Sequence, residues 1–216
     1  MYKSKYIYEM EFKAPFTLII VGPSSSGKSQ WLKTFLEHSY DIIHPTPNHV
    51  LYAYGEINPI VLEHRERGIE IYNGVPTQEK IKSLPRPSLV ILDDLMFDID
   101  DKYLNMLFTR GSHNWNCSIV LVCQTLYGRN LRTPRTNTHY LVIMKNNNLK
   151  QNISTIGHQM FPNQYGYFMD AYNDACQNPY SYILIDSHPS SNEDNRLFTN
   201  IFPGENTVKY IPSKTI

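Results

Sequence analysis

The sequence has little cysteine and no long hydrophobic run, and both absences exclude classes of protein. The three cysteines, Cys117, Cys123 and Cys176, are odd in number and show no Cys-x-x-Cys spacing. This argues against a disulfide framework and against a cysteine metal site, and favours free thiols in a reducing compartment. The longest clean apolar run, 16–21, is far too short to cross a bilayer, and the polar amino terminus does not resemble a secretory signal. We therefore expect a soluble, intracellular protein with no membrane partner.

The sequence also lacks net charge, but its charges are unevenly distributed. Lys and Arg together number 20, as do Asp and Glu, yet no acidic residue occurs between Lys102 and Met169. The basic residues of that stretch are Lys102, Arg110, Arg129, Arg132, Arg135, Lys145 and Lys150. A purely basic stretch can face a polyanion, either nucleic acid or nucleotide phosphate. The alternative is that much of the stretch is buried strand, where acidic residues are rare in any protein.

Length and apolar content favour one compact α/β domain. The chain has 216 residues, of which 41% are hydrophobic. We expect a single domain over 1–216, with a core of about 14–186 and a C-terminal strand and tail over 187–216. Strands are predicted at 16–21, 50–54, 69–72, 89–92, 118–123, 140–144 and 180–185, and helices at 29–38, from 100 or 101 to about 110, from about 150, and around 168–176. Because strands and helices alternate, we predict a mostly parallel sheet with helices on both faces.

A glycine-rich loop follows the first of these strands. The segment GPSSSGKS, Gly22 to Ser29, matches the pattern G-x-x-x-x-G-K-[ST] at every fixed position, between an apolar strand and an amphipathic helix. Glycines at both ends let the backbone curl so that its N–H groups point at a phosphate, and the helix adds its N-terminal partial positive charge. Lys28 can reach the β- and γ-phosphates, and the Ser29 hydroxyl can ligate Mg²⁺. The predicted nucleotide-binding residues are Gly22, Pro23, Ser24, Ser25, Ser26, Gly27, Lys28, Ser29 and Gln30.

Two later strands end in polar residues that suit the same chemistry. The apolar strand 89–92 leads into Asp93 and Asp94. Asp93 would hold Mg²⁺, and Asp94 would polarise the attacking water as a general base, although an Asp there could also simply cap a loop. The strand 118–123 leads into Gln124, which could hydrogen-bond the water or the γ-phosphate. Such a sensor is typical of ATPases with an extra strand, so 118–123 is expected between 16–21 and 89–92.

Several arginines are candidates for transition-state stabilisation or for DNA contact. Arg110 ends a predicted helix in the segment TRGSH and could reach the site of a neighbouring subunit as an arginine finger. Arg129, Arg132 and Arg135 lie in a polar connector, 128–139, and could grip DNA phosphates. For each of them a solvated surface charge is the alternative.

The later motifs narrow the family. In order along the chain occur GPSSSGKS, VILDDLM, LFTRGSH, VCQTL, NTHYLVIMKN and RLFTNIFPGE. The sequence resembles the genome-packaging ATPases of the FtsK/HerA superfamily over about 16–205. The resemblance is greatest to those of adintoviruses and the related Polinton (Maverick) elements, and more distant to poxvirus-type packaging ATPases.

The resemblance implies a motor that hydrolyses ATP with Mg²⁺ and pumps double-stranded DNA into a preformed capsid. It implies an extra-strand P-loop fold, a homo-oligomeric ring, and capsid or portal vertex proteins as partners. The compartment would be the host nucleus or cytoplasm, with transient location at the assembling capsid. By the family pattern, Lys28, Ser29, Asp93, Asp94 and Gln124 keep the roles given above, whereas the identity of the arginine finger does not transfer.

Two other functions fit parts of the pattern. A DNA helicase or transposition motor would share every catalytic residue but needs further domains, for which 216 residues leave little space. A small nucleotide or metabolite kinase would need a second substrate pocket and an arginine-rich lid, for which the basic connector could be mistaken. A paired carboxylate followed by a sensor Gln favours hydrolysis over transfer to a small acceptor.

Overall fold

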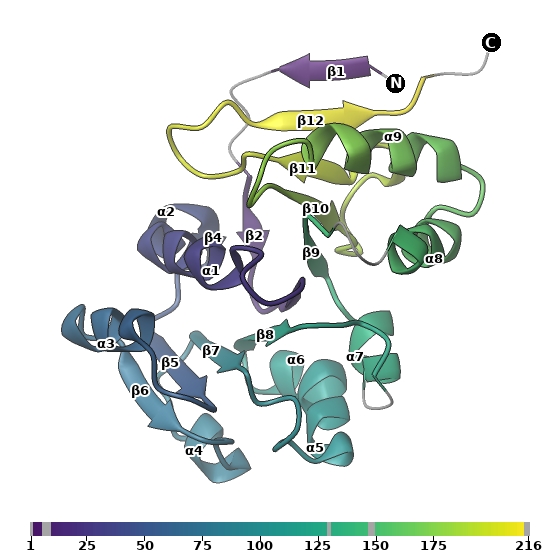
Figure 1. Ribbon diagram of the computed structural model, residues 1–216. Helices are drawn as coiled ribbons and strands as arrows, with labels where there is room; N and C mark the ends of the chain where they lie inside the picture. The colour runs from purple at the N-terminus through teal and green to yellow at the C-terminus, as the bar shows by residue number, and fades with distance from the viewer. Residues whose placement is uncertain (1, 6–9, 129–130, 147–149, 214–216) are drawn as a thin grey trace.

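A computed structural model describes residues 2–5, 10–128, 131–146 and 150–213. Its main feature is one ten-stranded sheet with the order β1-β12-β11-β10-β9-β3-β8-β7-β5-β6 (Figure 1). The strands of this sheet are β1 (Tyr2–Lys5), β3 (Thr17–Val21), β5 (His49–Tyr54), β6 (Glu70–Asn73), β7 (Ser88–Asp93), β8 (Cys117–Cys123), β9 (Tyr140–Met144), β10 (Tyr182–Asp186), β11 (Leu197–Thr199) and β12 (Val208–Ile211). A separate parallel pair is formed by β2 (Phe12–Lys13) and β4 (Ile43–His44).

The six strands from β9 to β6 are parallel, and their order confirms the extra-strand prediction. Strand β8 lies between β3 and β7 and pairs with both. In register, Val21 lies opposite Cys123, and Asp93 lies opposite Val122. The carboxyl ends of β3, β8 and β7 therefore meet at one edge of the sheet. Residues of these three strands are buried throughout, as expected for strands covered on both faces.

The remaining four strands extend the sheet with antiparallel pairing. β10 pairs with β9, β11 with β10, β12 with β11, and β1 with β12. The predicted strand 180–185 begins instead at Tyr182, and Tyr180 lies in the turn before it with a positive φ of 60°. Strand β1 was not predicted, because its short polar segment has no apolar alternation.

Helices cover both faces of the sheet, as predicted. Figure 1 shows α1, α2 and α3 to the left of the sheet and α5 to α9 to its right. The helical segments are α1 (Lys28–Glu37), α2 (Ser39–Ile42), α3 (Pro59–Glu66), α4 (Gln78–Lys82), α5 (Asp101–Met106), a π-helical turn η1 (Leu107–Gly111), α6 (Ser112–Asn114), α7 (Arg132–Thr136), α8 (Lys150–Met160), α9 (Tyr165–Ala175) and a 3₁₀ turn η3 (Glu193–Asn195). Two buried clusters result, one containing Phe35 of α1 and the other containing Leu104 of α5.

The helices differ from the prediction in three places: around Arg110, in the basic connector, and at two short helices. The helix expected to end near Arg110 continues through η1 and α6 to Asn114, so Arg110 lies in a π-helical turn rather than at a helix end. The basic connector 128–139 contains the short helix α7. The short helices α3 and α4 were missed. Among the described residues, none of the helices combines the length and hydrophobicity needed to span a bilayer.

Candidate active site

The glycine-rich loop connects β3 to α1 at the sheet edge described above. Gly22 N–H donates to the carbonyl of Cys123, at the end of β8, over 3.3 Å, which ties the start of the loop to the neighbouring strand. Gly27 precedes α1 with φ 100°, a left-handed conformation that side chains with a Cβ adopt only with strain. The loop therefore curls directly into the first turn of α1, as the phosphate-binding motif requires.

Lys28 lies at the mouth of this loop. Its ammonium group donates to the carbonyls of Gly22 (2.8 Å) and Pro23 (2.9 Å). Partial burial lowers the pKa of Lys28, while the nearby Asp93 and Asp94 carboxylates act in the opposite direction. Lys28 therefore lies within electrostatic range of both predicted acids, although they are more than sixty residues apart in sequence.

The loop residues fit a bound phosphate chain. Within the described part of the chain, the buried hydroxyl oxygen of Ser26 has no hydrogen-bond partner. Buried polar groups in proteins are nearly always hydrogen-bonded, so this oxygen is available to a ligand. A hollow of about 440 Å³ opens beside it, lined by Ser25, Gly27, Lys28, Ser29, Gln30 and Tyr180. Ser29 is half-buried and faces the hollow, whereas Ser24 and Gln30 are exposed. Donors, an ammonium group and a helix N-terminus converge here, a donor set suited to a polyphosphate with Mg²⁺.

Asp93 ends β7 and is 8% exposed. Tyr52 of β5 donates its hydroxyl to Asp93 Oδ2 over 2.6 Å, so one carboxylate oxygen is fixed in position. Burial raises the pKa of Asp93, while the Tyr52 hydrogen bond and the Lys28 charge lower it. Tyr52 was not predicted as a site residue, because the only local signal at this position is a predicted strand, and the pairing of that strand with β7 is not visible in sequence.

Asp94 follows Asp93 directly, in the turn after β7, and is exposed. Its backbone has φ 55°, uncommon for a residue other than glycine. Gly55, at the end of β5, donates its N–H to the Asp93 carbonyl over 3.0 Å, and a Cβ on Gly55 would lie 2.4 Å from the Asp94 carbonyl oxygen. A glycine is therefore required at position 55 for this turn to pack, and the sequence alone gave no indication of it.

Gln124 follows β8 directly and is exposed. Since β8 lies between β3 and β7, Gln124 comes from the strand between the phosphate loop and the two acids. This is the position expected for a sensor of the γ-phosphate or of the attacking water.

The predicted arginines do not join this cluster in one chain. Arg110 is exposed on η1, whose helix leads to the amino end of β8, opposite the edge with the glycine-rich loop. Arg135 stacks on the Tyr127 ring at 4.8 Å and donates to the carbonyl of Leu126, so it supports the segment after Gln124. Arg132 is exposed on α7, and Arg129 lies outside the described residues.

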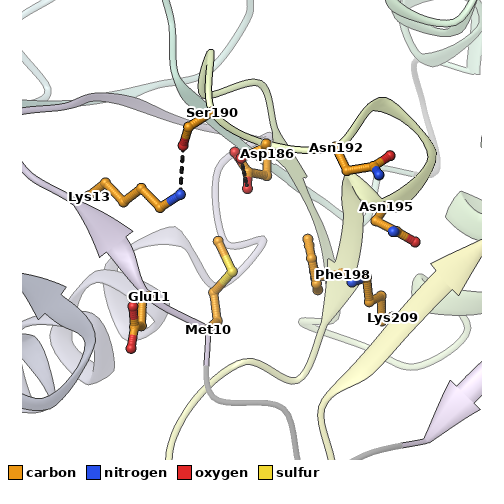
Figure 2. Close-up of a pocket in the computed structure, with 10 residues that line it drawn as sticks. Met10, Glu11, Lys13, Asp186, Ser190, Asn192, Asn195, Phe198 and Lys209 are labelled. Carbon is orange, nitrogen blue, oxygen red and sulfur yellow. Dashed lines mark hydrogen bonds between the residues drawn. The ribbon is translucent and has the colours of Figure 1, made fainter.

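A separate hollow of about 590 Å³, shown in Figure 2, lies elsewhere. It contains Asp186, which pairs with Tyr140 and so lies near the amino end of β3, away from the glycine-rich loop. Its lining is polar, and Lys13 Nζ donates to Ser190 Oγ over 2.6 Å. Size alone would favour this hollow, but the convergent phosphate-binding groups lie at the opposite edge of the sheet.

Comparison with known proteins gives structural matches only. No protein-family model and no curated protein sequence matches the chain. The genome packaging NTPase B204 from Sulfolobus turreted icosahedral virus 2, in complex with sulfate, is similar over 80% of this chain and 91% of its own, with 10% identity and a TM-score of 0.54. The cytoplasmic domain of the Type VII secretion ATPase EccC from Thermomonospora curvata is similar over 93% of this chain, with 14% identity and a TM-score of 0.53.

The two matches differ in coverage. This chain spans nearly all of the packaging NTPase but only 26% of the secretion ATPase. At such low identities the likeness concerns the fold. The chain therefore shares the fold of these two ATPases, a mostly parallel sheet with helices on both faces and with β8 between β3 and β7, as predicted.

Proposed function

We propose that this protein is an ATP-hydrolysing motor that moves double-stranded DNA into a viral capsid. The observation that carries the proposal is the convergence of Lys28, Asp93 and Asp94 at one sheet edge, with β8 inserted between their strands. The similarity to a viral genome packaging NTPase, over nearly its whole chain, supports the packaging role. The motifs after the phosphate loop support it independently.

In the proposed mechanism, the loop amides and Lys28 hold the β- and γ-phosphates. The Ser29 hydroxyl and the Asp93 carboxylate would hold Mg²⁺, which neutralises phosphate charge when bound. The Tyr52 hydroxyl donates to one Asp93 oxygen and so restricts the orientation of the carboxylate. Ser24, Ser25 and Ser26 supply further loop N–H and hydroxyl donors to the phosphates.

Asp94 and Gln124 act on the attacking water. The Asp94 carboxylate accepts a proton from the water as its oxygen bonds to the γ-phosphorus and the bond to the β-phosphate oxygen breaks. Gln124 donates or accepts a hydrogen bond that holds this water in line. An arginine from a neighbouring subunit of a ring, with Arg110 as first candidate, completes the charge stabilisation.

The DNA-facing surface is proposed on the stretch without acidic residues. Its described arginines include Arg132, exposed on α7 just beyond the Gln124 segment. A contact there would lie beside the γ-phosphate sensor, so DNA contact and hydrolysis could be coupled through a short segment. Arg129 belongs to the same proposal but lies outside the described residues.

The test is ATP hydrolysis with and without double-stranded DNA. We expect DNA to stimulate the wild-type rate, and Asp94→Asn to lower it by ~10²-fold or more, the range for a lost general base. Asp98→Asn is the matched control, because Asp98 is an exposed acid in the same turn region. A rate that ignores DNA and rises with a small phosphate acceptor would overturn the motor proposal in favour of a kinase.

A further inference from the structure

Tyr180 is an exposed aromatic residue beside the phosphate loop. Its side chain is 70% exposed, and it lines the same hollow as Gly27, Lys28 and Ser29. A Cβ placed on Gly27 would lie 3.2 Å from the Tyr180 Cβ, so the two backbones are close neighbours. Large aromatic side chains usually bury most of their surface, and one held at this position leaves its ring available to a ligand.

The backbone around Tyr180 holds the ring in this place. Tyr180 has φ 60°, a left-handed conformation that is a strained choice for a bulky side chain. The turn is fixed on both sides, since the Ser181 carbonyl accepts from Lys145 N (2.8 Å) and the Gln177 carbonyl accepts from Lys145 Nζ (2.6 Å). Lys145 follows β9, the strand next to β3, so the turn is tied to the sheet edge that carries the glycine-rich loop.

The order of strands gives the direction of a bound nucleotide. Asp93 and Asp94 follow β7, and Gln124 follows β8, so the metal and γ-phosphate end of the triphosphate lies on the β8 side of the glycine-rich loop. The nucleoside end must then extend to the other side, toward β9 and β10. Tyr180 lies there, two residues before the start of β10, and shares its hollow with Ser29 and Gln30 of the first turn of α1.

We propose that Tyr180 is the platform on which the purine base of the bound nucleotide stacks. This inference rests on the proposed nucleotide site and adds its specificity for the nucleoside. A stacked ring recognises the π-face of a base rather than its hydrogen-bonding edge, so adenine and guanine nucleotides would both bind. Tyr180 thereby contributes affinity for the nucleoside, while the loop and Lys28 contribute affinity for the phosphates.

The test compares two probes by titration calorimetry with Mg²⁺: β,γ-methylene-ATP, which carries the base, and inorganic tripolyphosphate, which does not. Tyr180→Gly removes the ring and suits the positive φ, whereas Tyr180→Phe keeps the ring. We expect Tyr180→Gly to weaken the nucleotide by ~10- to 100-fold, the range for one base–aromatic stack, and to leave tripolyphosphate unchanged. Tyr180→Phe should bind both probes like wild type.

Two controls separate this inference from the proposed function. Tyr40→Ala removes a tyrosine that is also 70% exposed but lies on α2, and it should change neither affinity. Lys28→Ala should weaken both probes. If Tyr180→Gly binds the nucleotide like wild type, or weakens both probes equally, the stacking role is wrong while the phosphate site stands. If Lys28→Ala leaves both affinities unchanged, the nucleotide site itself is wrong, and the stacking role fails with it.

Discussion

The Tyr52 hydroxyl and the Asp93 carboxylate form a buried pair on neighbouring parallel strands. The hydrogen bond of 2.6 Å stabilises the ionised carboxylate, which burial alone disfavours. An ionised Asp93 is the form that binds a metal ion, so a residue on β5, three strands along the sheet from β3 and its phosphate loop, affects the metal site. Tyr52 is a positioning residue, because it acts through Asp93 rather than on the nucleotide.

Tyr52→Phe should shift the pH dependence of hydrolysis. Without the hydrogen bond, the pKa of Asp93 rises further, since burial remains and one stabilising contact is lost. Protonated Asp93 binds Mg²⁺ poorly, so the acidic limb of the rate profile should move to higher pH, and more Mg²⁺ should be needed at a fixed low pH. The measurement is the rate of hydrolysis against pH at several Mg²⁺ concentrations.

The comparison variant is Tyr54→Phe, a tyrosine of the same strand that is only partly buried. It should leave the profile unchanged. An acidic limb that stays in place in Tyr52→Phe, with a uniformly lower rate at all pH values, would indicate a purely structural role for Tyr52.

At the scale of elements, the strands of the parallel core were predicted well and the short helices poorly. The runs 16–21, 89–92 and 118–123 are apolar throughout because both faces of these strands are covered, and that pattern is visible in sequence. Helix α3 is only eight residues long and is capped by Asn58, whereas α7 has five residues and no side-chain cap. Helices this short depend on tertiary packing, which leaves little pattern in the sequence.

The residues of the candidate site also fall into a group that could be predicted from sequence and a group that could not. The phosphate loop is contiguous and follows a known spacing, so every one of its residues could be named from sequence. Tyr52 and Gly55 come from β5 and its end, and Tyr180 comes from the turn before β10. Only the sheet order brings them to Asp93, Asp94 and Gly27. No local pattern marks a residue whose role depends on a neighbour in space.

Helix α3 offers a test of how an element supports the site. Asn58 caps it by accepting from the N–H groups of Ile60 (3.0 Å) and Val61 (3.2 Å), and its His64 ring packs on Tyr52 with centroids 4.9 Å apart. Asn58→Ala should destabilise the protein by ~1 kcal/mol, the usual effect of losing such a cap. For a chain of this size that lowers Tm by about 2–4 °C in a thermal scan.

Asn58→Asp is the matched variant, because aspartate caps a helix as well as asparagine does. It should keep the wild-type Tm. Equal losses in both variants would show that the amide nitrogen, rather than the capping oxygen, matters at this position.

At the scale of the whole molecule, the site is proposed to be shared between subunits. Arg110 lies on η1, and its helix ends at the amino edge of the sheet, far from the phosphate loop of its own chain. The π-helical turn interrupts the α-helical spacing, so the Arg110 side chain points in a direction that a regular α-helix would not give it. Such turns are frequent at functional sites. A ring in which the Arg110 of one subunit meets the phosphate loop of the next would bring the two together.

Mixing two inactive variants tests this arrangement. Lys28→Ala damages the phosphate loop but keeps Arg110, and Arg110→Ala keeps the loop but lacks the finger, so each alone should be nearly inactive. In a random equal mixture, roughly a quarter of head-to-tail interfaces combine an intact loop with an intact Arg110, because each partner is the required one half of the time. Hydrolysis should therefore return on mixing and rise with the assembled fraction measured by light scattering.

The mixture of Lys28→Ala with Asp94→Asn is the control. Lys28 and Asp94 both belong to the part of the site that one chain supplies, so every subunit in this mixture has a defective site and no interface is repaired. Mixed rings that assemble but hydrolyse no faster than this control would contradict a role for Arg110 across the interface.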